Sequence, residues 1–462
     1  MAPFTREVLA RSVAPMDSAT PSHAQGRLAL ASHRIVTPEG LVDGHVVLWG
    51  GRVAAVAPGA PPARLPVLDL GDLALLPGLV DTHVHVNEPG RAEWEGFATA
   101  CRAALAGGIT TIVDMPLNSV PATTTLAALR LKRRAAEGAA VRVEYWAGLV
   151  PGNTGELEPL AAAGVRGFKC FMVPSGVDEF GHVGEAELRA ALPVIARTGL
   201  PLLVHAELPG PIERATAGLA GRDPRAYATY LASRPPAAEV EAIRLVLRLA
   251  ATARCRVHIV HLATADALPE LRAARDRGES VTVETCPHYL TFAAEDIADG
   301  ATEFKCAPPI REREQRERLW AALMAGDIDL VASDHSPCLP AMKRRERGEW
   351  MGAWGGIASL ELGLGVMWTE ARRRGATLEQ IVRWMAERPA ALAGLAGRVG
   401  AIVPGADADL VAFDPDAAWT VDATRLRQRH PVTPYAGRRI EGRVVRVWRA
   451  GLEQAIAAGG GG

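Results

Sequence analysis

The sequence predicts an α/β protein: a (β/α)8 barrel of the TIM type with a small β-sandwich domain built from both termini. The first observation is that short apolar runs alternate with stretches rich in Ala, Leu and Arg over residues 76–396. The second is that segments of alternating apolar and polar residues lie on both sides of this region. The runs expected to form the eight barrel strands are 79–86, 109–114, 141–149, 167–172, 202–205, 257–261, 281–284 and 330–333.

The segments at the two ends have the pattern of antiparallel strands. Turn signals at Pro38-Glu39-Gly40 and Gly50-Gly51 divide the first segment. A similar alternation of apolar and polar residues returns after Val399. We therefore expect residues 26–75 and 397–455 to build one β-sandwich, with residues 76–396 forming the barrel. A flexible extension over residues 1–25 and a tail over residues 456–462 complete the expected organisation.

Helices of suitable length separate the apolar runs. Residues 185–198 and 237–253 carry apolar residues at helical spacing, with Arg and Glu on the opposite face. A doubly wound open sheet is the alternative fold. The barrel is favoured because side chains able to bind metal end the first, fourth, fifth, sixth and eighth runs, and in a barrel those ends meet at one rim.

Composition and charge narrow the possible functions. The 462 residues include 51 basic and 52 acidic residues, giving a formal charge of −1, and no basic stripe indicates a nucleic-acid or membrane partner. The six cysteines lack the paired spacing of a thiolate metal site and are typical of reduced thiols in a cytoplasmic enzyme. The N-terminus shows no apolar core of a secretory signal.

Four histidines at the ends of apolar runs are candidate metal ligands. His83 and His85 are two residues apart, so their imidazoles point to the same side of a strand. His205 and His261 each close a run that has the composition of a buried strand. Each histidine alone would more simply be a hydrogen-bonded core residue, but the joint pattern favours a metal centre. His258, three residues before the end of its run, is expected to be structural.

Asp334 and Lys169 complete the candidate centre. Asp334 ends the last run and could cap the following helix, but among these histidines it is expected to bind metal and transfer protons. Lys169 cannot bind metal as an ammonium, whereas its neutral amine can add carbon dioxide to form a carbamate that bridges two ions. A salt-bridged lysine is the alternative. His335 and His288 are candidates for supporting or substrate contacts.

The chain resembles the amidohydrolase superfamily, specifically its cyclic-amidohydrolase branch of dihydroorotases, hydantoinases and allantoinases. Within the branch it is most similar to the allantoinases, from about Leu76 to the C-terminus. The resemblance implies a centre of two metals bridged by carboxylated Lys169, a β-sandwich beside the barrel, and commonly a homotetramer. The segments that carry it are 83–96, 114–119, 167–171, 233–235, 284–289, 305–311, 333–338, 353–357 and 435–438.

Departures from the sister families favour a neutral ureido substrate. Dihydroorotases carry an arginine that binds the substrate carboxylate, and Asn87 stands in its place here. Two further dihydroorotase motifs are replaced by Met115-Pro-Leu-Asn118 and by 307–311, Ala-Pro-Pro-Ile-Arg. The tyrosine that hydantoinases carry shortly after the bridging lysine has no counterpart in residues 170–176.

The resemblance implies hydrolysis of the hydantoin-ring amide of allantoin to allantoate. The expected nucleophile is a hydroxide bridging two divalent metals, with Asp334 passing its proton to the leaving nitrogen. Zinc is the expected metal, although cobalt, manganese, nickel or iron suit the same ligands. By analogy with hydantoinase, backbone groups near Cys286 and Gly355 are expected to contact substrate. The alternatives are a hydantoinase or dihydropyrimidinase, and a non-catalytic scaffold of the same fold.

Overall fold

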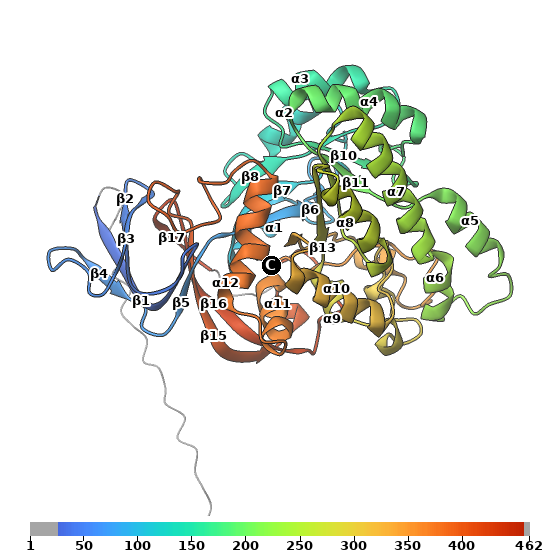
Figure 1. Ribbon diagram of the computed structural model, residues 1–462. Coiled ribbons are helices and arrows are strands. Elements are labelled where there is room, and N and C mark those ends of the chain that lie inside the picture. The colour runs from blue at the N-terminus through green and yellow to red at the C-terminus, as the bar shows by residue number, and fades with distance from the viewer. Residues whose placement is uncertain (1–25, 457–462) are drawn as a thin grey trace, which may run out of the picture.

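The computed structural model describes residues 26–456, and within them it has a β domain beside a barrel ringed by helices (Figure 1). The extension expected over residues 1–25 and, of the tail expected over residues 456–462, residues 457–462 lie outside the described residues. No helix in the described range is both long and apolar enough to cross a bilayer.

The barrel closes, which confirms the predicted fold and excludes an open doubly wound sheet. Six strands form one parallel sheet in the order β14-β13-β12-β11-β10-β9, and β6-β7-β8 form a second. β8 and β9 are two parts of one strand interrupted at Trp146, and a parallel bridge between Val84 and His335 joins the other edges. The strands are β6 (Leu79–Val84), β7 (Ile109–Asp114), β8 (Arg142–Tyr145), β9 (Ala147–Gly148), β10 (Phe168–Phe171), β11 (Leu202–His205), β12 (Val257–Ile259), β13 (Val281–Thr285) and β14 (Leu330–Val331).

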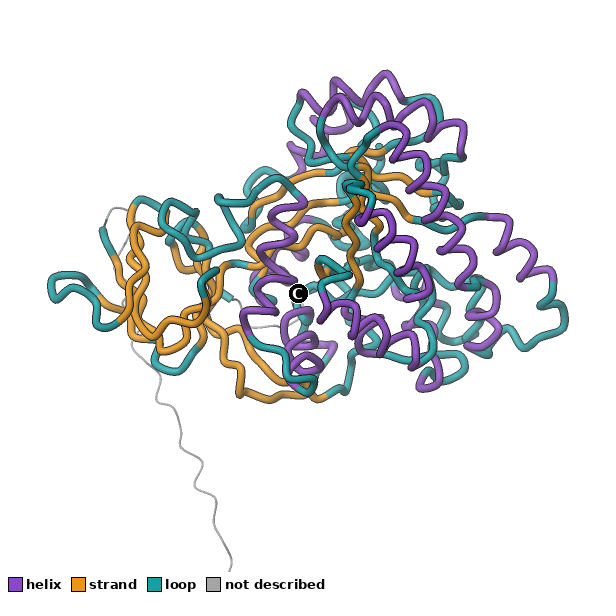
Figure 2. The backbone as a smooth tube through the Cα atoms, in the orientation of Figure 1, coloured by secondary structure: helices purple, strands orange, loops and turns teal. Residues whose placement is uncertain are grey.

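Helices surround the strands, as Figure 2 shows. In α4, the apolar residues Leu188, Leu192 and Ile195 are buried because they lie on one face of the helix. The helix begins where Glu187 accepts a hydrogen bond from the Gly184 amide, and it ends before Gly199 in the left-handed conformation. The helices are α1 (Phe97–Ala106), α2 (Leu126–Ala135), α3 (Leu157–Ala162), α4 (Glu185–Thr198), α5 (Pro209–Ala217), α6 (Tyr227–Ser233), α7 (Pro236–Ala253), α8 (Leu268–Asp276), α9 (Pro287–Thr291), α10 (Arg313–Ala325), α11 (Gly363–Arg372), α12 (Leu378–Val382) and α13 (Arg388–Leu392).

The β domain combines strands from both ends of the chain. Its sheet has the order β17-β16-β15-β5-β1-β2-β3, with β4 paired to β1, so β15 from the C-terminal part lies beside β5 from the N-terminal part. The domain has its own core, which includes Leu30, Val46, Leu410 and Trp448. Its strands are β1 (Leu28–Thr37), β2 (Gly40–Trp49), β3 (Arg52–Pro58), β4 (Val67–Asp69), β5 (Ala74–Pro77), β15 (Leu410–Thr420), β16 (Arg439–Arg449) and β17 (Leu452–Gln454).

The strand register places the candidate site over an apolar plug inside the barrel. Lys169 pairs with Leu203, and Phe171 pairs with His205, so all four side chains lie on the same side of their strands. Leu203 belongs to a buried cluster that also contains Leu330 from the far side of the ring. Lys169 and His205 therefore project toward the barrel axis.

Candidate metal centre

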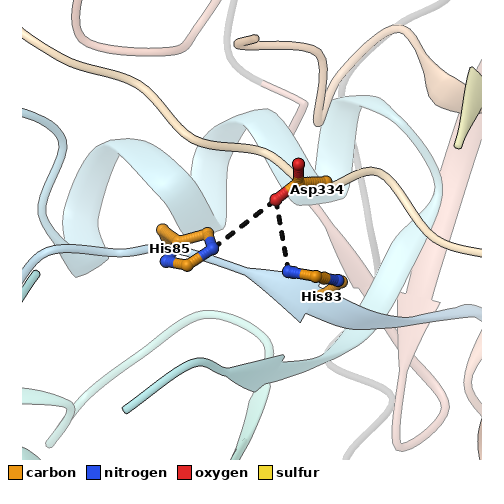
Figure 3. A group of neighbouring side chains, drawn as sticks. All are labelled: His83, His85 and Asp334. Carbon is orange, nitrogen blue, oxygen red and sulfur yellow. Dashed lines mark ion pairs between the residues drawn. The ribbon is translucent and has the colours of Figure 1, made fainter. Parts of the chain in front are cut away.

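His83, His85 and Asp334 form the tightest group of candidate ligands. His83 lies one residue before the end of β6, His85 directly follows the strand, and Asp334 follows β14, the neighbouring strand in the ring. One Asp334 oxygen, Oδ1, lies 3.2 Å from His83 Nε2 and 3.5 Å from His85 Nε2. Figure 3 marks both contacts with dashed lines. All three side chains are buried, and their ligand atoms lie within 4.8 Å of one another. Such a group of imidazole and carboxylate donors suits a divalent ion.

His205 and His261 form a second group on β11 and after β12. His205 Nδ1 lies 3.0 Å from His261 Nε2, and the His261 ring centroid lies 5.4 Å from that of His83. Burial lowers the pKa of His205 to about 4 and the pKa of His261 well below its usual value. Both imidazoles are therefore neutral at neutral pH, the form that binds metal.

Lys169 is fully buried beside these histidines. Its Nζ has no hydrogen-bond partner among the described residues and lies 4.8 Å from the centroid of the Phe171 ring. Burial lowers the pKa of the amine to about 8, although the carboxylates of Glu284 and Asp334 act to raise it. Its charge in turn acts to lower the pKa of His261. A buried amine without a partner, facing neutral imidazoles, fits a lysine modified to an anionic ligand better than a structural ion pair.

The backbone is strained at three residues of the site. His261 has φ of 40°, Asp334 of 46° and Asn118 of 67°, a left-handed conformation that non-glycine residues seldom adopt. Asn118 places its side-chain nitrogen 3.4 Å from Nδ1 of His85. Strain of this kind persists where surrounding contacts hold side chains in positions needed for function.

Glu284, which sequence reasoning did not select, connects three of the histidines. Its Oε1 lies 2.5 Å from His83 Nδ1, and its Oε2 lies 3.0 Å from His258 Nε2. The backbone N–H of His261 also donates to Oε1, at 3.3 Å. Burial by itself would raise the pKa of this carboxyl, but His83 and His258 hold it well below its usual value. By accepting the Nδ1 proton of His83, Glu284 leaves Nε2 free to bind metal. His258, expected to be structural, completes this support.

Glu207 has the same relation to His205. Its Oε2 lies 2.8 Å from His205 Nε2, which leaves Nδ1 directed at His261. Arg234 forms an ion pair with Glu207, with Nε 3.0 Å from Oε1. The available sequence signal was position: Glu207 lies two residues beyond His205, and Glu284 ends its apolar run.

A cavity of about 340 Å3 opens over the candidate ligands. Gly355, expected to contact substrate, lines it, whereas Cys286 is fully buried and is not among the lining residues. His288 is buried near the site, with neither ring nitrogen hydrogen-bonded within the described chain. His335 Nδ1 accepts hydrogen bonds from the backbone of Ser359 and Leu360, so it supports the wall behind Asp334.

Comparisons with known proteins agree with this geometry. Residues 74–452 match the model of the amidohydrolase family. An allantoinase from Streptomyces avermitilis is 51% identical, covering 94% of this chain and 96% of its own, and one from Arabidopsis thaliana is 45% identical, covering 90% and 85%. The structure of an L-hydantoinase (dihydropyrimidinase) from Arthrobacter aurescens superimposes with a TM-score of 0.88 at 32% identity, covering 94% of this chain and 97% of that one. The chain, with its closed barrel and its rim of imidazoles around Asp334, belongs to the amidohydrolase family.

Proposed function

We propose that the chain hydrolyses the cyclic amide of allantoin to give allantoate. The observation that carries a hydrolytic function is the convergence of four imidazoles, Asp334 and Lys169 beneath one cavity, with the buried Lys169 amine unpartnered in the described part of the chain. The similarity to allantoinases over nearly the whole chain supports allantoin as the substrate. Asn87, in place of a carboxylate-binding arginine, is consistent with an uncharged ring substituent.

The proposed centre would hold two divalent ions. His83 and His85 would hold one, His205 and His261 the other, and Lys169 and Asp334 would complete the ligand set. The neutral Lys169 amine can add carbon dioxide, which forms an N–C bond, releases a proton and leaves an anionic carbamate. Bound ions would supply the positive charge that makes water acidic near neutral pH and that polarises a carbonyl. Zinc is the proposed metal, and cobalt, manganese, nickel and iron suit the same donors.

The residues of the chain orient the substrate and move the proton. Hydrolysis forms a bond from a water oxygen to the ring carbonyl carbon and breaks the ring carbon–nitrogen bond. We assign the proton transfer to the Asp334 carboxylate, which accepts the proton from the attacking water and delivers it to the leaving nitrogen. Its Oδ1 also accepts a hydrogen bond from the Ser336 hydroxyl at 2.9 Å, which fixes its orientation.

A side-by-side assay tests the substrate. The purified chain is given allantoin, hydantoin, dihydrouracil and dihydroorotate, and kcat/KM is compared. Allantoin is expected to be the best substrate. Faster turnover of hydantoin or dihydrouracil would instead assign the chain to the second candidate function, a hydantoinase or dihydropyrimidinase. The similarity of the fold to an L-hydantoinase structure is the observation behind this second candidate.

Metal analysis tests the requirement for ions. Dialysis against a chelator should abolish turnover, and added divalent ions should restore it. A chain that binds no metal and turns over none of the four compounds would be a non-catalytic scaffold of this fold.

We further propose a cytoplasmic homotetramer. The six cysteines are all buried as free thiols, which suits a reducing compartment, and light scattering tests the assembly.

A further inference from the structure

The cavity wall carries two cationic side chains besides the histidines, Arg234 and Lys305. The charge of Arg234 is compensated by its ion pair with buried Glu207. Lys305 has no such partner: none of the described carboxylates lies within 4 Å of its Nζ. The cavity therefore contains one cation whose charge the surrounding protein leaves uncompensated.

One N–H group of the Lys305 ammonium has no acceptor among the described residues. Its Nζ donates to the backbone carbonyl of Met351 at 3.0 Å and to that of Ala353 at 2.7 Å, and it lies 5.0 Å from the centroid of the Tyr230 ring. An ammonium has three N–H groups, so one remains without a partner within residues 26–456. Met351, Ala353 and Tyr230 also line the cavity, so the amine lies at the surface that a substrate would touch.

The environment of Lys305 favours an electron-rich ligand atom. Burial, together with the nearby positive charges of Lys343, Arg234 and Arg344, lowers the pKa of its amine to about 7. A buried cation without a carboxylate partner is stabilised when an acceptor enters beside it. Allantoin differs from hydantoin by a ureido group on the ring, and the carbonyl oxygen of that group is such an acceptor.

We infer that Lys305 is the residue that selects a cyclic amide bearing a ureido group, by donating its free N–H to the ureido carbonyl oxygen. This inference rests on the proposed function and extends it from the reaction to the recognition of the side group. One hydrogen bond to a charged donor corresponds to a preference of about tenfold to a hundredfold. Hydantoin lacks the ureido carbonyl and would leave that third N–H without a partner.

Lys343 offers a matched control. It is buried and holds the same wall segment: its Nζ donates to the backbone carbonyls of Trp354 (3.0 Å), Gly356 and Lys305 (3.2 Å). It is not among the residues that line the cavity. Removing the Lys343 amine thus disturbs the wall but takes away no group that can touch substrate. Removing the Lys305 amine disturbs the wall and also takes away a group that can touch substrate.

The experiment compares kcat/KM for allantoin and hydantoin in the unaltered chain, in Lys305→Met and in Lys343→Met, each loaded with metal. Lys305→Met should lose at least tenfold more on allantoin than on hydantoin, whereas Lys343→Met should lose similar factors on both. If hydantoin turnover is too slow to measure, its inhibition constant against allantoin replaces kcat/KM. Lys305→Gln, which keeps an amide donor for the wall, provides a second variant if Lys305→Met does not fold.

The outcomes separate the two proposals. If Lys305→Met loses equal factors on both substrates, Lys305 only supports the wall and the inference is overturned, while the proposed function stands. If the unaltered, metal-loaded chain does not hydrolyse allantoin, both fall. If dihydroorotate is turned over faster than allantoin and Lys305→Met removes that advantage, the partner of Lys305 is a carboxylate, which also overturns the ureido assignment.

Discussion

The substitution Glu284→Gln tests how far the metal centre depends on a carboxylate that need not touch an ion. The side chain is fully buried, and its two oxygens serve His83 Nδ1 at 2.5 Å and His258 Nε2 at 3.0 Å. Glutamine has nearly the same volume, but it replaces one oxygen with an NH2 group, which donates. A donor would then face an imidazole N–H, and one imidazole must lose its bond or change tautomer.

The expected magnitude follows from that loss. If His83 changes tautomer, its Nε2 carries the proton and no longer binds metal. Residues that orient a metal-binding imidazole typically contribute tenfold to a hundredfold in metal affinity. This corresponds to about 1.4 to 2.7 kcal/mol, since tenfold is about 1.4 kcal/mol. We expect Glu284→Gln to weaken binding by this factor at one of the two ions, which competition against a chelator, read out by elemental analysis, would measure.

Glu239→Gln is the matched control. Glu239 is also buried, but it accepts hydrogen bonds from Arg311 and from the Ala263 amide and contacts no imidazole among the described residues. The substitution Glu239→Gln should lower the free energy of unfolding with little change in metal affinity. The reasoning is refuted if Glu284→Gln binds metal as tightly as the unaltered chain, or if Glu239→Gln weakens metal binding equally.

Three further substitutions probe the proton transfer, the bridging ligand and the rim. Asp334→Asn should lower kcat by about a hundredfold to ten-thousandfold while much of the metal is retained; a near-normal kcat would exclude Asp334 from the proton transfer. Lys169→Met should lower the metal-to-protein ratio and lack the mass increment of one carbon dioxide that we expect for the unaltered chain in native mass spectrometry; full metal content would contradict the bridging role. Lys132→Met leaves buried Asp114, whose Oδ2 lies 2.6 Å from the Lys132 amine, without its cationic partner and with only the Val86 amide as a donor among the described residues, and should cost about 3–5 kcal/mol in urea unfolding. The exposed Arg189→Met is its control, and an equal loss would contradict the prediction.

Features that depend on neighbours in the chain were predictable. The helix expected over residues 185–198 has those bounds in the structure, because its cap at Gly184, its apolar spacing and its terminal Gly199 all act within a few residues. The eight barrel strands were also found where short apolar runs indicated them. The ends of strands were less predictable. The third strand is interrupted at Trp146, where the backbone N–H groups change partner from β7 (Trp146 to Asp114) to the chain before β10 (Ala147 to Gly167). The Trp146 indole N–H donates to the Thr82 carbonyl, 64 residues away in sequence.

By itself, the sequence determined the alternation of strands and helices and the six candidate side chains that lie at or near the carboxyl ends of the barrel strands, because periodicity and composition act locally. Only the tertiary structure decided how those side chains are supported. Glu284 meets His83 across 201 residues, and Lys305 reaches carbonyls 46 and 48 residues further along the chain. Such pairs form because barrel closure brings distant strand ends and loops to one rim, and no local pattern specifies which buried donor will meet which acceptor.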